Sequence, residues 1–261
     1  MLSGRTAELP AFGGIRWVWL RNAKVWARNW KSSLVGTLGE PLFYFLGLGY
    51  GLNTIVPASG GQSYLHYVVP GLMLSSVMHS ATIEATYGTF SKMRHQQIHA
   101  SMTLSPLTFE EIVLGEMLWA VTKGLLSGVT VLSLAILTGV VPPWPGCAVL
   151  GLLPVAGIIF ASMGFIATAL ARAYDSFNYY FTLVISPMFF FSGIFFPVAG
   201  LGPGAEAVAW FFPLTHLAAV SRMLCQGRLG AELLPELAWL AVFALLAFWG
   251  AVKLMARRFL L

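Results

Sequence analysis

Long apolar segments constrain this sequence most, because six of them fill most of a chain of 261 residues. A helix needs roughly 20 consecutive apolar residues to cross a bilayer. Only 10% of the residues are charged, whereas a soluble domain carries about 25%. The pattern therefore predicts an all-α polytopic membrane protein with a single transmembrane domain over residues 1–261. Its six predicted spans cover residues 33–56, 66–87, 111–138, 147–171, 177–198 and 233–254.

The lysine and arginine residues predict how these spans are oriented. Of the 15, twelve flank the spans on the side that holds both termini, Arg222 and Arg228 flank the other side, and Lys123 falls inside the third span. Basic loops tend to stay in the cytoplasm, so we expect both termini there. The net charge of +5 then reflects basic groups that face anionic lipid, and it gives no reason to expect nucleic-acid binding.

The basic segment before the first span has the pattern of a helix that lies on the membrane surface. At about 100° per residue, Trp19, Trp26 and Trp30 fall on one stripe, and Arg21 and its neighbouring cations fall on the opposite one. A helix with tryptophan on one face and cations on the other lies at the headgroup boundary. We therefore predict an interfacial helix over residues 14–31.

The connection between the fifth and sixth spans is too apolar for an ordinary loop and too short to cross the membrane twice. It contains a Gly/Pro turn, an apolar piece, Pro213 and a second apolar piece. This pattern indicates two short helices within residues 205–225 that dip into the outer leaflet and return. Such a backbone path is tolerated only against protein or a water-filled cavity. We therefore expect the pair to pack at the outer mouth of a pathway.

Motifs for catalysis, metal binding and nucleotide binding do not emerge from the sequence. None of the five lysines follows the glycine-rich phosphate-binding pattern. His95 and His99 have the spacing of two metal ligands on a helix, but no acidic residue lies between them, which favours two solvated loop residues. We therefore predict no catalytic residue, no metal site and no cofactor in this chain. If ATP drives the protein, another chain binds the ATP and its Mg²⁺.

Four charged residues fall within or at the edges of the predicted spans, where charge is costly and is by default a functional hypothesis. They are Glu40, Glu84, Glu116 and Lys123. All three acids lie near predicted cytoplasmic ends, where water is close, and Glu116 and Lys123 can share one helix face. These positions favour a structural or gating role. They leave a proton-coupled secondary transporter open as an alternative.

Aromatic residues crowd the fifth predicted span, where nine of them surround Pro187. Proline has no backbone N–H, so it should kink this helix about midway. The aromatic side chains either face lipid or form a wall on which sugar rings and acyl chains can pack, and the sequence leaves both open. The candidate pathway residues, from the first and fifth spans, are Tyr44, Tyr50, Tyr180, Phe181, Phe189 and Phe190.

Pro106 marks the boundary between a cytoplasmic loop and the third span, because proline disfavours helix for the residue before it. Thr108 and Glu111 form a T-x-x-E capping box, which starts the third span at Thr108. Upstream, residues 91–104 have the pattern of a short cytoplasmic helix with apolar groups left over, which suggests docking to a partner chain. Its candidate coupling residues are Met93, Arg94, His95, Ile98, His99, Met102 and Leu104.

Three stretches of the chain resemble ABC-2 type exporter permeases. They are LSPLTFEEIVLGEMLW at 104–119, GEPLFYFLGLGYGL at 39–52, and the region from FFFSGIFFP to PLTHLAAVSRMLCQG at 189–227. The resemblance covers essentially the whole chain. It is closest to the NodJ-like permeases, which work with a NodI-like ATPase to export lipo-chitooligosaccharides.

This resemblance implies a permease subunit of an ABC exporter in the bacterial inner membrane, which works as a homodimer with two copies of a separate ATPase. It implies that residues 91–104 form the coupling helix, which seats in a cleft of the ATPase. It also implies that the re-entrant pair closes the outer mouth. There the candidate gate residues are Phe196, Pro197, Pro213 and His216. The expected cargo is an amphipathic glycolipid, lipo-oligosaccharide or polysaccharide-type substrate, and the alternative within the class is a drug or antibiotic efflux permease.

Overall fold

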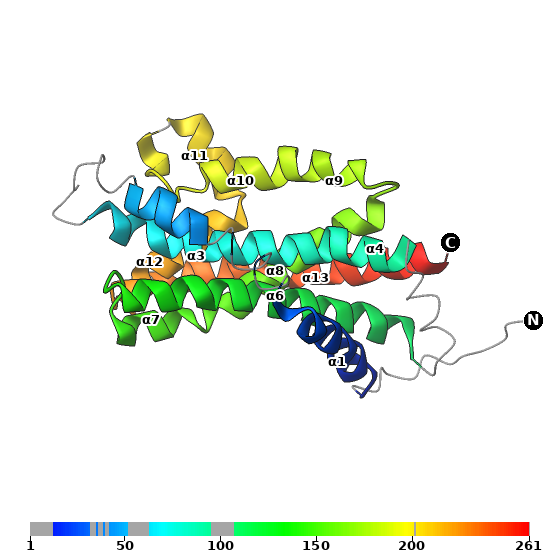
Figure 1. Cartoon of the computed structure of the whole chain (residues 1–261). Coiled ribbons are helices and arrows are strands. Elements are labelled where there is room, and N and C mark those ends of the chain that lie inside the picture. Colours follow the sequence, from blue (N-terminus) through cyan, green and yellow to red (C-terminus); the bar gives the residue numbers. More distant parts are fainter. Residues whose placement is uncertain are drawn as a thin grey trace, which may run out of the picture.

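The computed structural model describes residues 13–31, 35, 39, 42–51, 63–94, 107–200 and 202–260 (Figure 1). Every regular element in this part of the chain is a helix, which confirms the all-α class. Four helices pack together along the long axis of the molecule and carry most of its core. They are α3 (Tyr64–Ile83), α6 (Phe109–Leu137), α8 (Leu152–Leu170) and α13 (Leu233–Leu260).

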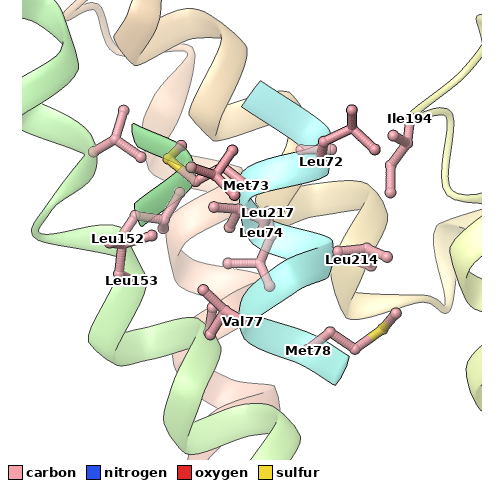
Figure 2. Close-up of a cluster of buried hydrophobic side chains, with 14 of the residues drawn as sticks. Leu72, Met73, Leu74, Val77, Met78, Leu152, Leu153, Ile194, Leu214 and Leu217 are labelled. Atoms are coloured by element: carbon pink, nitrogen blue, oxygen red, sulfur yellow. The ribbon is translucent and has the colours of Figure 1, made fainter. Parts of the chain in front are cut away.

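The hydrophobic core is built around α3, which is apolar on all sides, as expected of a helix that is buried all round. Leu74 and Val77 of α3 are completely buried, and Leu153 of α8 and Leu217 of α12 (Pro213–Cys225) belong to the same cluster (Figure 2). A Cβ added at Gly128 of α6 would lie 2.6 Å from a methyl carbon of Val77. Glycine at this position therefore permits the close approach of α3 and α6.

Three helical segments of the described chain are long and apolar enough to cross a membrane. They are Phe109–Leu137, Pro143–Leu170, which begins with α7 (Pro143–Val149), and Leu233–Arg258. The bent pair of α11 (Pro203–Trp210) and α12 makes a fourth if it is counted as one span. The count of six spans stays a prediction, because half of residues 33–56 lies outside the described residues and three or four segments of the described chain are long and apolar enough.

Two other long helical segments are interrupted by π-helical turns. α3 continues through η2 (Glu84–Gly88) into α4 (Thr89–Arg94). In the same way, α9 (Asp175–Tyr180) continues through η3 (Phe181–Ile185) into α10 (Ser186–Phe191). Pro187 explains the second interruption, because it has no N–H to donate and its ring crowds the carbonyl four residues back. The irregularity expected at Pro187 thus takes the form of a π-helical turn directly before α10.

The N-terminal helix α1 (Gly13–Arg28) packs against α6 beside its predicted tryptophan stripe. Its buried residues, Gly14, Val18 and Asn22, are four residues apart and lie next to the stripe rather than on it. A Cβ added at Gly115 of α6 would lie 2.6 Å from Val18, so small residues on both helices select this face. The position of α1 at the membrane surface stays a prediction.

Helices α11 and α12 meet at 89°, and α12 begins at Pro213 as its sequence indicated. Proline is favoured at the first position of a helix, where its missing N–H is not needed. α12 packs against α3 and α13, which places it at one end of the core (Figure 1). The return of this pair into the membrane stays a prediction.

Candidate functional site

The continuous helical segment formed by α3, η2 and α4 (Tyr64–Arg94) is called the α3 segment. A largely buried lysine joins its C-terminal end to α6. Lys92 of α4 lies 2.8 Å from an oxygen of Glu84 in η2 and 2.7 Å from an oxygen of Glu116 in α6. The Glu116 side chain is only 1% exposed, and those of Lys92 and Glu84 are 13% and 16% exposed. A buried ion pair of this kind is hard to break one partner at a time, since the remaining charge is left without compensation.

The electrostatic balance of this cluster keeps Lys92 charged. Burial alone would lower the pKa of Lys92, but the nearby carboxylates of Glu84 and Glu116 outweigh burial, so the pKa of Lys92 lies above its ordinary value. The ammonium group is therefore present throughout the physiological pH range. It can hold both carboxylates at once, and this fixes η2 and α4 against α6.

A further carboxylate, that of Glu111, accepts hydrogen bonds at the N-terminal ends of two helices, α6 and α1. Thr108 Oγ1 accepts from the Glu111 N–H at 3.3 Å, and a Glu111 oxygen accepts from the Thr108 N–H at 2.8 Å, which confirms the predicted capping box. The other oxygen of Glu111 accepts from the Gly14 N–H of α1 at 3.1 Å. A Cβ at Gly14 would lie 2.3 Å from this carboxyl group, so the contact requires glycine. Sequence reasoning found the first role of Glu111 and missed the second.

The candidate coupling residues fall at the edge of the described chain. Met93 of α4 is half-buried against a small cluster that contains Phe90 and Phe177, whereas Arg94 is exposed. The remaining candidates lie outside the described residues: His95, Ile98, His99, Met102 and Leu104. Lys92 itself thus lies at the start of the predicted coupling segment, residues 91–104.

Three of the four charged residues predicted within the spans lie near Lys92, which was not among the predicted site residues. Glu84 and Glu116 are joined by Lys92, and Lys123 lines a cavity together with Glu84 and Lys92. Glu40 lies outside the described residues. The signal for Lys92 was available, because eight residues separate it from Glu84 and place both on one helix face.

Some of the candidate pathway residues meet in an aromatic cluster between η1 (Tyr44–Gly51), α3 and α10. The rings of Tyr44 and Phe189 are 5.3 Å apart, and the His79 ring lies 5.2 Å from Phe189. Phe190 is 5.2 Å from Phe189 and is 52% exposed. Sequence reasoning missed His79 as a member of this cluster.

The other candidate pathway residues lie apart from that cluster. The Phe181 ring lies 5.8 Å from the tilted ring of Tyr87 in η2, and it meets its neighbour Tyr180 edge-on at 6.0 Å. The side chain of Tyr50 is outside the described part of the structure. The fifth predicted span therefore contacts the α3 segment at two levels, once through Phe189 and once through Phe181.

At the opposite end of α3, Arg222 of α12 holds a non-helical segment that follows α10. Its Nε donates to the Tyr67 carbonyl at 3.1 Å, and a terminal nitrogen donates to the Gly193 carbonyl at 2.5 Å and the Ile194 carbonyl at 3.4 Å. The guanidinium group also lies 4.1 Å from the centre of the Tyr67 ring. Gly193 has φ +74°, a conformation that favours glycine.

The predicted gate residues lie in two different parts of the structure. Phe196 and Pro197 are exposed and come two to three residues after Ile194, the last residue that Arg222 contacts. Pro213 starts α12, and His216 is buried within it. The two ring nitrogens of His216 lie 2.5 Å from a Glu236 oxygen of α13 and 2.7 Å from the Trp210 carbonyl. Sequence reasoning did not identify Glu236 as the partner of His216.

The described residues contain no group of three or more His, Cys, Asp or Glu side chains that could hold a metal ion. Their polar side chains instead form structural links: one through Lys92, one through Glu111, one through Arg222 and one through His216. These links connect helices that are distant in sequence. Such an arrangement can transmit movement between the ends of a helical bundle.

Comparison with known proteins points to one family. The profile of the family described as "ABC-2 type transporter" matches residues 14–224. The chain is 36% identical to Nodulation protein J of Rhizobium leguminosarum bv. viciae over 254 residues, which covers 97% of this chain and 98% of that protein. It is 37% identical to Nodulation protein J of Sinorhizobium fredii over 246 residues, 93% of each chain. It is 24% identical to the inner membrane transport permease YadH of Escherichia coli over 234 residues, 89% of this chain and 90% of the permease.

Proposed function

Because the chain belongs to the ABC-2 type transporter family, we propose that it is the membrane-embedded permease subunit of an ATP-driven exporter. The observation that carries this proposal is the similarity to Nodulation protein J along nearly the full length of both chains. As a member of this family the chain is a transport component of the membrane, not a catalytic one. Under the proposal, ATP and Mg²⁺ bind to a separate ATPase subunit.

The assembly we propose is a homodimer with two ATPase subunits in the bacterial inner membrane. Each permease would cross the membrane six times, with both termini in the cytoplasm. The long apolar helices and the excess of basic residues beside the termini support this orientation. A cysteine placed at Arg94 should then react with an impermeant maleimide only in inside-out vesicles, and reaction in right-side-out vesicles would contradict the orientation.

The coupling route we propose runs through the buried lysine. ATP-driven closure of the two ATPase subunits would move the segment 91–104, which begins within α4 and includes Lys92. Lys92 would pass this movement to α6, because its ammonium group lies 2.7 Å from Glu116. Glu111 would carry it on to α1 through the Gly14 N–H. The dimer would in this way shift between inward-closed and outward-open states.

The cargo we propose is an amphipathic glycolipid or lipo-oligosaccharide. Similarity to Nodulation protein J supports this class, and so does the cluster of Tyr44, His79 and Phe189, because aromatic faces pack against both sugar rings and acyl chains. Phe189→Ala should lower transport of a lipo-chitooligosaccharide about tenfold or more, whereas Leu183→Ala, at a position that is 70% exposed, should leave it nearly unchanged. Equal transport by the two variants would remove this aromatic cluster from the pathway.

The experiment that tests the proposal reconstitutes the purified permease in inside-out vesicles with a candidate P-loop ATPase from a neighbouring gene. Uptake of a labelled lipo-chitooligosaccharide should require both ATP and the ATPase. Uptake of unrelated drugs in place of the glycolipid would favour an efflux permease within the same family. Uptake without any ATPase, lost on Glu84→Gln, would instead support a proton-coupled transporter.

A further inference from the structure

A polar cavity of about 190 Å³ lies where α1 meets α6 and the end of the α3 segment. Its walls include Asn22 and Trp26 of α1, Glu84 and Lys92, and Trp119 and Lys123 of α6. One molecule of liquid water occupies roughly 30 Å³, so the cavity has room for a group several times that size. The aromatic cluster around Phe189 is not part of its wall in the described structure.

Two N–H donors in this wall have no acceptor among the described residues. They are Nδ2 of Asn22 and Nε1 of Trp26, and both atoms are buried. Asn22 is 3% exposed, and its Oδ1 already accepts from Arg21 at 3.2 Å, which leaves the Nδ2 group for another partner. A buried donor without an acceptor loses its hydrogen bond to water and gains none in return, which is energetically costly. The cavity therefore calls for a ligand that supplies acceptor oxygens.

The charges in the wall restrict which acceptor fits. Lys92, Lys123 and Glu84 line the cavity and together carry one net positive charge, whereas Glu116, which also pairs with Lys92, is not among the lining residues. A polyanion would be repelled by Glu84, which lines the cavity. A phosphate ester with a single negative charge offers oxygens to the Asn22 and Trp26 donors while its charge faces Lys123.

The surroundings of the cavity indicate that this phosphate belongs to a lipid. Residues 14–31, most of which form α1, are predicted to lie at headgroup level, and three apolar side chains in this range are exposed: Trp17 (63%), Val25 (54%) and Trp30 (52%), of which Val25 also lines the cavity. Exposed tryptophan and apolar residues at this level pack against acyl chains. We propose that the cavity binds the phosphodiester of a membrane phospholipid and so ties α1 to the charged cluster around Lys92. This site is separate from the proposed cargo pathway.

Native mass spectrometry of the purified permease can test this site directly. After delipidation, one phosphatidylglycerol per chain should rebind, while diacylglycerol, which lacks the phosphate, should not. Inorganic phosphate and glycerol 3-phosphate should bind at least tenfold more weakly than the lipid. Equal binding of inorganic phosphate would assign the cavity to a free anion and overturn the lipid assignment, and failure of every phosphate compound to bind would leave only water as its occupant.

Variants of α1 provide the matched comparison. Trp26→Phe keeps the ring and removes the N–H, so it should weaken phosphatidylglycerol binding by roughly tenfold, the expected loss for a hydrogen bond to a charged group. Asn22→Leu should have a similar effect and serves as the second test if Trp26→Phe does not fold. Trp144→Phe, in α7 at a position that is 86% exposed and away from the cavity wall, is the control and should bind as the wild type does. Equal binding by all three variants would overturn the proposal whether or not the transport function is confirmed.

Discussion

Two buried cations, Lys92 and Arg222, hold the two ends of the α3 segment in different ways. Lys92 binds two carboxylates, Glu84 and Glu116, from η2 and α6. Arg222 instead binds backbone carbonyls, including that of Gly193, and stacks on the Tyr67 ring. The first link joins helices through charges that balance one another. The second satisfies the carbonyls of a segment that has no helical hydrogen bonds of its own.

The difference indicates what each end can do. A carbonyl oxygen belongs to the backbone, so the Arg222 contacts fix the path of residues 193–194 itself. Carboxylates lie at the tips of side chains, so the Lys92 contacts tie α4 to α6 and make them move together without fixing the backbone path of either. We therefore expect the Lys92 end to transmit movement and the Arg222 end to shape a fixed loop. The following substitutions test that contrast, from the largest expected effect to the smallest.

The largest effect is expected from Lys92→Met, which leaves the nearly buried Glu116 without its cation. Breaking a buried ion pair on one side costs about 3–5 kcal/mol, and the thermal unfolding of the detergent-solubilised protein should shift accordingly. The double variant with Glu116→Gln should recover part of the loss. Lys24→Met, at an exposed position, is the control. An unchanged unfolding temperature in Lys92→Met would show that the cluster does not hold α4 on α6.

The pH dependence of the Lys92 contribution has a defined sign. Its pKa is raised in the folded protein, so the stabilisation is complete below the unfolded pKa and is lost only as pH rises through the higher folded value. The difference in stability between the wild type and Lys92→Met should therefore stay constant from about pH 7 to pH 9. Unfolding curves of both proteins across this range measure it, and a steady decline would contradict the assignment.

A smaller loss, about 2–3 kcal/mol, is expected from Arg222→Met, because the carbonyls of Tyr67, Gly193 and Ile194 each lose a charged donor, although Gly193 still accepts from the Tyr67 hydroxyl. Arg222→Lys should restore little of it, since one ammonium cannot reproduce the fork that reaches Tyr67 and Gly193 together. Arg228→Met, at an exposed position six residues further along the chain, is the control. Protease cleavage after residue 193 would report local loosening, and resistance equal to the wild type would count against a fixed loop.

Neighbouring glycines give the next comparison. A Cβ at Gly14 would collide with the Glu111 carboxyl group, whereas nothing lies within 4 Å of a Cβ at Gly13. Gly14→Ala should therefore cost about 1–2 kcal/mol by overpacking and loosen α1 from α6, while Gly13→Ala should be neutral or slightly stabilising. Disulfide cross-linking between cysteines introduced in α1 and α6 measures the contact. Equal cross-linking in both variants would show that Glu111 does not anchor α1.

The smallest effect is expected from Trp19→Phe. The indole N–H of Trp19 donates to Thr122 Oγ1 at 2.9 Å, and its loss should cost about 1 kcal/mol. Trp17→Phe lies on the exposed face of the same helix and should change nothing. The same cross-linking assay can rank the two variants. A larger effect of Trp17→Phe would place the packing face of α1 elsewhere.

Sequence reasoning succeeded where the physics is local. The capping box of Thr108 and Glu111 spans three residues, and Pro213 starts α12 by a property of proline alone. The all-α class followed from composition. These features need no knowledge of which helices are neighbours.

The missed contacts depend on how distant helices pack. Lys92 and Glu116 are 24 positions apart, and Arg222 and Tyr67 are 155 positions apart. Only the helix arrangement brings them together, so Lys92 and Arg222 looked like loop cations that merely set orientation. The contact of α1 with α6 depends on packing in the same way, because the sequence showed the tryptophan stripe but not the neighbouring face that meets α6. Hydrophobicity selected the tryptophans, whereas close packing selected the smaller Gly14 and Val18.

The most direct test of the central claim measures transport with and without the ATPase and with Lys92 altered. In reconstituted vesicles, uptake of a labelled lipo-chitooligosaccharide should require the partner ATPase and ATP. A folded Lys92→Gln variant should still bind the ATPase but hydrolyse ATP without transport. Uptake that continues without any ATPase, or that is unaffected in Lys92→Gln, would contradict the proposed coupling through this lysine.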